Sequence, residues 1–168
     1  MKQLIFSLAT LLTITACGQG DKSQRPSPPT KASETITSGA VVTIDYSQPS
    51  VKGRKIGTEL ATYGKVWRTG ANEATIFETS KDVNVEGKAL AAGKYSLYSI
   101  PGENEWVIIF NKTWKQWGTQ YKEEDDALRV NVKPGKSAAF TEKMTFTVNK
   151  SGKVSLMWGD EQVDFTVQ

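Results

Sequence analysis

The chain has 168 residues, of which 38% are hydrophobic, and its 21 basic and 18 acidic side chains give a formal net charge of +3. This length and apolar content predict a single domain with one core, and the balanced charge excludes a typical nucleic-acid-binding protein. The chain has no histidine and only one cysteine, Cys17. These counts exclude catalytic triads and dyads built on histidine, and zinc sites built on histidine and cysteine.

The first 18 residues predict a lipoprotein signal peptide. Lys2 supplies a positive charge, residues 4–14 form an apolar stretch too short to span a membrane, and Cys17 follows Ile-Thr-Ala and precedes Gly18. This order is typical of the bacterial lipobox, in which residues 1–16 are removed and the cysteine is acylated with chains such as palmitate. The alternative is an ordinary secretory signal with an incidental cysteine. Gly18 in place of a retention aspartate predicts an outer-membrane lipid anchor, on the periplasmic or surface face.

Residues 17–34 predict a flexible tether that begins at the lipidated cysteine. From Gly18 onward this segment lacks large apolar side chains and contains three prolines, which favour extended conformations. The remaining residues, 35–168, are expected to form one domain.

The domain is predicted to be all-β, an antiparallel β-sandwich of about eight strands that resembles a jelly roll. Short alternating segments separated by Gly, Pro, Asn and Asp support this interpretation, and no long segment has a helical period. Any helix is expected to be short and to lie within residues 55–63 or 111–126. The expected strands are residues 40–46, 75–79, 94–100, 106–111, 128–132, 143–149, 153–158 and 162–167.

Residues 46–75 form an irregular segment rich in polar and aromatic side chains, and long irregular segments inside domains are often functional. Four motifs carry a resemblance: YSQPSVKGRKIG (46–57), YGKVWRTGANEAT (63–75), GKALAAGKYSLYSIPG (87–102), and EWVIIFNK with the WG that ends at residue 118. On these motifs the chain resembles an uncharacterised family of bacterial exported proteins, often lipoproteins, that is defined only as a domain of unknown function. The resemblance implies an exported β-domain and no assigned activity. We call residues 63–75 the central block.

Seven side chains are candidates for ligand binding. Arginine pairs with carboxylates or phosphates, Asn and Glu add hydrogen-bonding groups, and Trp offers a flat face for a sugar ring. The alternative is structural: Arg68 pairs with Glu73, Asn72 adopts a left-handed turn and Trp67 belongs to the core. In that case Arg54 is the group that meets a ligand. The candidates are Arg54, Trp67, Arg68, Asn72, Glu73, Trp114 and Trp117.

The sequence defines no catalytic set, and we interpret the chain as a binding protein in preference to an enzyme. The acidic residues 123–126 lack the spacing of a calcium loop and are expected to form a solvated loop, so neither a metal nor another cofactor is expected. The leading hypothesis is a lipid-anchored envelope protein that binds a glycan or a small anionic ligand. The alternatives are a structural or accessory outer-membrane lipoprotein that docks a protein partner and, third, a histidine-free hydrolase that uses Glu73 with Arg68 or Tyr63.

Overall fold

The computed structural model describes residues 21–168, so the predictions for residues 1–16 and for Cys17 lie outside the described part. The described residues form ten strands and two short 3₁₀-helices. The strands are β1 (Pro29–Thr35), β2 (Val41–Ser47), β3 (Thr75–Thr79), β4 (Val83–Val85), β5 (Lys88–Leu90), β6 (Gly93–Ile100), β7 (Trp106–Asn111), β8 (Asp126–Val132), β9 (Pro134–Val148) and β10 (Lys153–Thr166).

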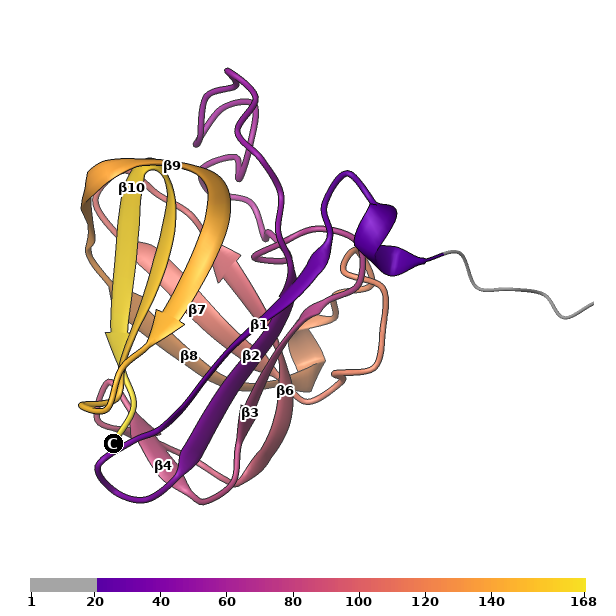
Figure 1. The fold of residues 1–168 in the computed structure, drawn as a ribbon. Coiled ribbons are helices and arrows are strands. Elements are labelled where there is room, and N and C mark those ends of the chain that lie inside the picture. The colour runs from indigo at the N-terminus through magenta and orange to yellow at the C-terminus, as the bar shows by residue number, and fades with distance from the viewer. Residues whose placement is uncertain (1–20) are drawn as a thin grey trace, which may run out of the picture.

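Six strands form one antiparallel sheet in the order β1-β2-β3-β6-β7-β8, and the long β9-β10 hairpin lies across it as a second layer (Figure 1). Backbone hydrogen bonds tie this second layer to the rest of the chain: Met144 N in β9 donates to Pro49 O at 2.9 Å, and Asn84 N donates to the carbonyl of Gln168, just after β10, at 2.7 Å. The prediction of an all-β antiparallel sandwich is therefore confirmed, with ten strands instead of about eight.

The main core fills the space between the sheet and the hairpin because alternate residues of each strand point inward. In β2 the buried residues Val42 and Ile44 alternate with less buried ones, and β10 buries Phe165 against the rings of Phe77 and Phe110. On the opposite face of the sheet, Tyr98 and Ile109 form a smaller buried cluster with Ala74. Because β6 is buried on both faces, loops must cover its outer side.

The hairpin is longer than the sequence predicts. Residues 153–158 and 162–167, expected as separate strands, form the single strand β10, whose pairing with β9 shifts register on either side of Gly159. Gly159 has a φ of +60°, and the strand folds back there: Val167 N, just after β10, donates to Gly152 O, just before it, at 2.9 Å (Figure 1). The N-terminal half of β9 pairs with the C-terminal half of β10. This half of β9 was not predicted as a strand, because its residues are mostly exposed and show no alternating pattern.

The N-terminal segment packs on the domain. Residues 29–34, which the sequence analysis placed in the tether, belong to the edge strand β1 and pair with β2. The 3₁₀-helix η1 (Lys22–Gln24) precedes it, outside the ranges expected for helices, whereas η2 (Glu123–Asp125) falls inside one of them. No helix among residues 21–168 is long and apolar enough to cross a membrane.

Candidate functional site

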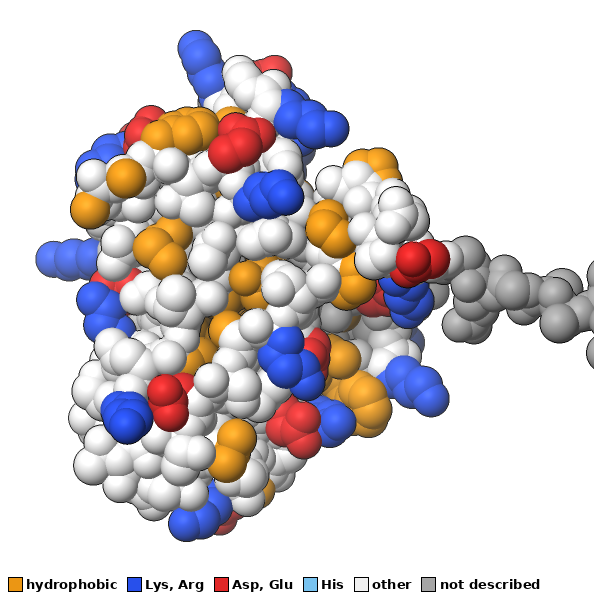
Figure 2. Space-filling model, viewed as in Figure 1, with side chains coloured by type: hydrophobic (Ala, Val, Ile, Leu, Met, Phe, Trp, Pro, Cys, Tyr) orange, Lys and Arg blue, Asp and Glu red, His pale blue; other side chains and the backbone are white. Residues whose placement is uncertain are grey.

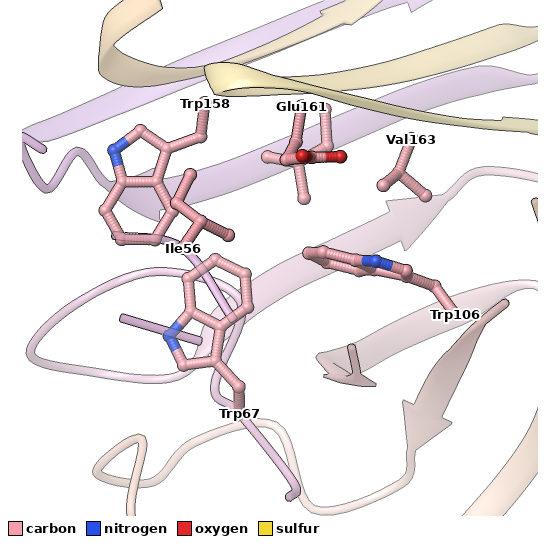
Figure 3. A pocket seen from close by; sticks show the side chains of 7 residues that line it. Ile56, Trp67, Trp106, Trp158, Glu161 and Val163 are labelled. Carbon is pink, nitrogen blue, oxygen red and sulfur yellow. The ribbon is translucent and has the colours of Figure 1, made fainter. Parts of the chain in front are cut away.

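The placement of Trp67 determines which way the next residue, Arg68, points. Its backbone extends the edge of β6: Trp67 N donates to Ser99 O at 2.7 Å, and Ser99 N donates to Trp67 O at 2.9 Å. The Trp67 ring points into the end of the core, where it stacks on Trp158 with centroids 5.3 Å apart and meets the edge of Trp106 at 6.2 Å (Figure 3). Since neighbouring residues in extended chain point to opposite faces, Arg68 points out of the core.

A tight turn follows Arg68. Thr69 and Asn72 both have positive φ angles, of +48° and +60°. The left-handed conformation expected for Asn72 is confirmed. Gly70 does not have a positive φ; glycine is needed there for space, because a Cβ would lie 2.6 Å from Thr75 Oγ1. A positive φ at a buried β-branched residue such as Thr69 is strained, and hydrogen bonds from its hydroxyl to Ser99 Oγ and from Thr75 to its carbonyl hold it in place.

The turn directs Glu73 toward the N-terminal segment, so the predicted ion pair between Arg68 and Glu73 is wrong. Glu73 accepts hydrogen bonds from Lys22 Nζ at 3.0 Å and from Arg25 Nη1 at 2.9 Å and 3.0 Å. Asn72 Nδ2 donates to Ser27 O at 3.0 Å. Nothing in the sequence pattern indicates this contact, because Lys22 and Arg25 lie in the stretch that was predicted to be a tether.

These bonds make the stability of the N-terminal contact depend on pH. Burial alone would raise the pKa of Glu73, but hydrogen bonds from its own backbone N–H, Lys22 and Arg25 outweigh burial and lower the pKa from 4.5 to about 2. A depressed pKa means that the stabilisation is complete above pH 4.5 and is lost as the pH falls toward 2. Because the Glu73 side chain is 39% exposed, solvent screening limits the loss to about 1 kcal/mol or less.

We therefore expect parent and Glu73→Gln to differ in free energy of unfolding near neutral pH and to converge as the pH approaches 2. Chemical denaturation at a series of pH values measures this difference. Glu78→Gln is the matched control, since Glu78 forms a similarly exposed ion pair with Lys94 on the sheet. A difference between parent and Glu73→Gln that stays constant across the acid range would contradict the assignment.

Arg68 faces an open pocket of about 360 Å³ on the outer side of the sheet. Its Nε is buried and has no hydrogen-bond partner among residues 21–168. The side chain passes close to Gly118, where a Cβ would lie 2.4 Å from Arg68 Cδ. The other residues that line the pocket are Val66, Trp67, Tyr98, Gly118, Thr119 and Tyr121.

Tyr98 supplies a second polar group to this pocket. Its hydroxyl accepts a hydrogen bond from Gln116 Nε2 at 3.1 Å, which leaves its own proton available for donation. Burial raises the pKa of Tyr98, so the hydroxyl stays protonated at neutral pH. The guanidinium of Arg68, with its buried Nε, and a phenolic O–H thus belong to residues that line the same pocket.

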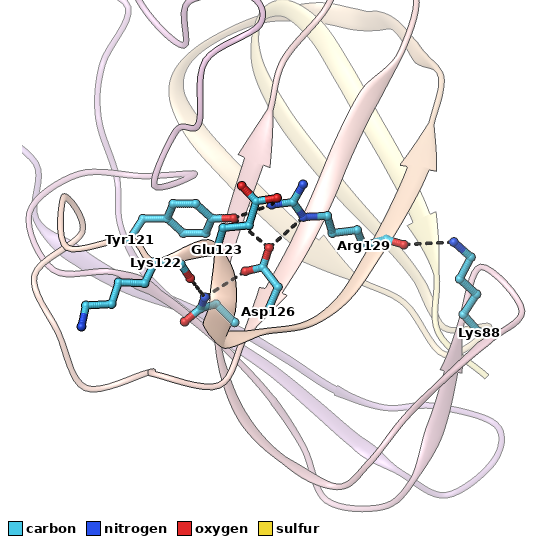
Figure 4. Close-up of polar contacts among 7 residues, drawn as sticks. Lys88, Tyr121, Lys122, Glu123, Asp126 and Arg129 are labelled. Atoms are coloured by element: carbon cyan, nitrogen blue, oxygen red, sulfur yellow. Dashed lines mark hydrogen bonds and ion pairs between the residues drawn. The ribbon is translucent and has the colours of Figure 1, made fainter.

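The Tyr121 side of the pocket is held by a network at the start of β8. Tyr121 donates to Asp126 Oδ2 at 2.7 Å and accepts from Arg129 Nη2 at 2.7 Å, while Arg129 Nε bonds to the same Asp126 oxygen (Figure 4). Burial, followed by the hydrogen bond to Asp126, raises the pKa of Tyr121 to about 12. Asp126 therefore belongs to this network, and Glu123 pairs with Arg129 at 3.1 Å, so the acidic run is only partly solvated.

Arg54 lies elsewhere, beside the bend of the β9-β10 hairpin around Gly159. Its Nε and Nη2 donate to Val51 O at 3.1 Å and Ser50 O at 2.9 Å. It lines a separate open pocket of about 290 Å³ that also includes Lys136 and Glu161, which pair with each other. The structure therefore does not bring Arg54 and Arg68 into one site.

Trp114 and Trp117 lie outside both pockets, in the loop between β7 and β8. They are 36% and 46% exposed, and Lys94 Nζ lies 5.2 Å from the centre of the Trp114 ring. Of the seven candidates, only Trp67 and Arg68 line the Arg68 pocket; sequence reasoning missed Tyr98, Gly118 and Tyr121, although the first two lie inside the quoted motifs.

Among residues 21–168, His, Cys, Asp and Glu form no group of three that could hold a metal ion. No curated protein and no solved structure was found to match the chain. The family model described as protein of unknown function DUF2911 matches residues 27–167, which include all ten strands. The chain therefore belongs to the DUF2911 family.

Proposed function

We propose that this protein is an envelope lipoprotein whose domain binds a small anionic ligand, of the carboxylate or phosphate class, at Arg68. The observation that carries the proposal is the buried Arg68 Nε, which has no hydrogen-bond partner among the described residues and belongs to a side chain that lines an open pocket. Buried donors are nearly always paired, and an unpaired one costs stability. An anion in the pocket would supply the missing acceptor and neutralise the guanidinium.

The shape of the pocket supports a small ligand. Its volume of about 360 Å³ lies at the lower end of the range for small-molecule sites. Arg68 offers a planar fork that matches a carboxylate or phosphate, and the Tyr98 hydroxyl adds a neutral donor. A neutral glycan has less support here, because one face of the Trp67 ring is stacked on Trp158.

Titration of residues 21–168, which contain every strand of the domain, with inorganic phosphate, acetate and citrate in a calorimeter tests the proposal. We expect at least one probe to bind, and Arg68→Met to weaken that binding about 30-fold or more, the effect of about 2 kcal/mol for hydrogen bonds to a charged group. Arg68→Lys, which keeps the charge but loses the fork, is expected to retain part of the affinity. Because Arg68 has no carboxylate partner among residues 21–168, its removal is expected to lower the free energy of unfolding by no more than about 0.5 kcal/mol.

Arg54→Met is the matched control. It removes a cation whose guanidinium is already bound to backbone carbonyls, and we expect anion binding to remain unchanged. Loss of binding in Arg54→Met with retention in Arg68→Met would place the site at the hairpin and contradict the proposal. No binding of any probe by the parent would leave the structural or accessory role.

The membrane anchor is proposed from the sequence alone. Cys17 is the only thiol of the chain and occupies the lipobox position, outside the described residues. Cys17→Ser is expected to abolish acylation, so that mass spectrometry finds no diacylglycerol on the mature chain and the protein leaves the outer-membrane fraction. An unchanged processed mass and unchanged fractionation would show that the cysteine is incidental.

A further inference from the structure

We infer that the loop of residues 112–122 docks on the surface of a phospholipid bilayer, with Trp114 and Trp117 in the headgroup region. This inference goes beyond anion binding and rests on the proposed anchor at Cys17 for its orientation. Tryptophan prefers the membrane–water interface because its ring is apolar while its N–H needs a polar partner. Two of the five tryptophans lie on this short loop and are among the few large hydrophobic side chains that the described residues expose.

The exposure of the two rings is imposed by a well-held loop. Lys112 N donates to Asp125 O at 2.8 Å at one end, and Gln120 N donates to Trp117 O at 2.9 Å in the turn. Between them, Ser96 Oγ donates to Thr113 O at 2.8 Å. The rings are therefore presented outward by fixed backbone, and docking them costs little ordering entropy.

The same loop lies beside the point where the described chain begins. The backbone of Glu73 forms an isolated antiparallel β-bridge with Trp117. The Glu73 carboxylate also accepts a hydrogen bond at 3.0 Å from Lys22, the second described residue. Figure 1 shows the loop between β7 and β8 on the same side of the molecule as η1. Cys17 precedes Asp21 by only four residues, at most about 15 Å of extended chain. An anchor at Cys17 would therefore hold this face against the membrane and make docking an intramolecular step, for which a weak affinity suffices.

The charges of the loop suit headgroup phosphates. Within residues 112–122 three lysines and no carboxylate occur, and Lys112, Lys115 and Lys122 are all exposed. Figure 2 shows hydrophobic, basic and acidic side chains next to one another on this side of the molecule. The carboxylates that follow, Glu123 and Glu124, begin η2; Glu123 pairs with Arg129, and Glu124 remains exposed. Lysine between tryptophans reaches the phosphates while the rings enter the interface.

The test places the domain on vesicles of phosphatidylethanolamine and phosphatidylglycerol that contain lipids brominated near the headgroup end of the acyl chain, which quench nearby tryptophans. The full lipidated chain is compared with its Trp114→Phe/Trp117→Phe variant. Trp106 and Trp158 are 3% and 4% exposed, and with Trp67 they form an internal reference inside the core. We expect strong quenching of the parent and almost none of the variant. Equal fractional quenching of the two chains would overturn the inference.

A second experiment attaches the domain to vesicles without the lipid on Cys17, so that docking is tested separately from the proposed lipidation. Residues 21–168 carrying an N-terminal hexahistidine tag are held on vesicles with a nickel-chelating lipid; the chain has no histidine of its own. The same difference in quenching is expected with this anchor even if Cys17 is not acylated. A matched control is Phe140→Ser, which removes an exposed aromatic side chain from β9 on the other side of the sandwich and should leave the quenching unchanged. Quenching that persists in the variant lacking both exposed tryptophans, or that disappears in Phe140→Ser, would assign the bilayer contact to a different face.

Discussion

Trp67→Ala is expected to lower the free energy of unfolding by about 3 to 5 kcal/mol, as large-to-small changes of packed aromatic residues do. The Trp67 ring lies between Trp158 and Trp106 at the end of the core, so its removal leaves a cavity and breaks both aromatic contacts (Figure 3). A loss of this size is a large part of the total stability of an ordinary domain, about 5 to 15 kcal/mol. Urea denaturation followed by circular dichroism measures it.

Trp117→Ala is the matched control for this prediction. Trp117 is the same residue type but is 46% exposed, and its replacement is expected to change the free energy of unfolding by less than about 0.5 kcal/mol. If Trp67→Ala instead unfolded at the parent's urea concentration, the ring would contribute little to the core. Trp67 would then return to the role of a ligand-binding surface.

Much of the fold could be predicted because the strands of the sheet alternate. The bounds expected for residues 75–79 and 106–111 are those of β3 and β7, since both strands carry large apolar side chains between turn residues. β1 and the first half of β9 were missed for a common reason. Both are stabilised by main-chain pairing at the edge of a layer, which leaves exposed polar residues without a sequence pattern.

The site was only partly predictable because its key contacts depend on long-range placement. Arg68 was identified as a ligand-binding candidate from its residue type, but its partner was predicted from sequence proximity. Glu73 is five residues away along the chain, yet it bonds to Lys22 and Arg25, about 50 positions earlier. Tyr98 enters the pocket from β6, and nothing in its own strand distinguishes it from a core tyrosine.

Gly118→Ala is expected to abolish anion binding by displacing Arg68, although it removes no group that binds. A Cβ at residue 118 would lie 2.4 Å from Arg68 Cδ and 2.9 Å from Asn72 O. Because these separations are far below van der Waals contact, the Arg68 side chain must leave its position, and the backbone of the turn must shift. We expect the affinity for the anion probe to fall at least as far as in Arg68→Met, and the free energy of unfolding to fall by about 1 to 3 kcal/mol.

Two further variants show whether the loss passes through Arg68. Gly135→Ala is the control, because a Cβ there meets nothing closer than Gln162 O at 3.9 Å, and we expect parent-like binding and stability. Adding Arg68→Ala to Gly118→Ala removes the clashing Cδ and is expected to recover part of the lost stability while binding stays absent, a coupling that independent sites would not show. Parent-like affinity in Gly118→Ala would mean that the position of Arg68 does not matter for binding, and an anion site at this pocket would have to be abandoned.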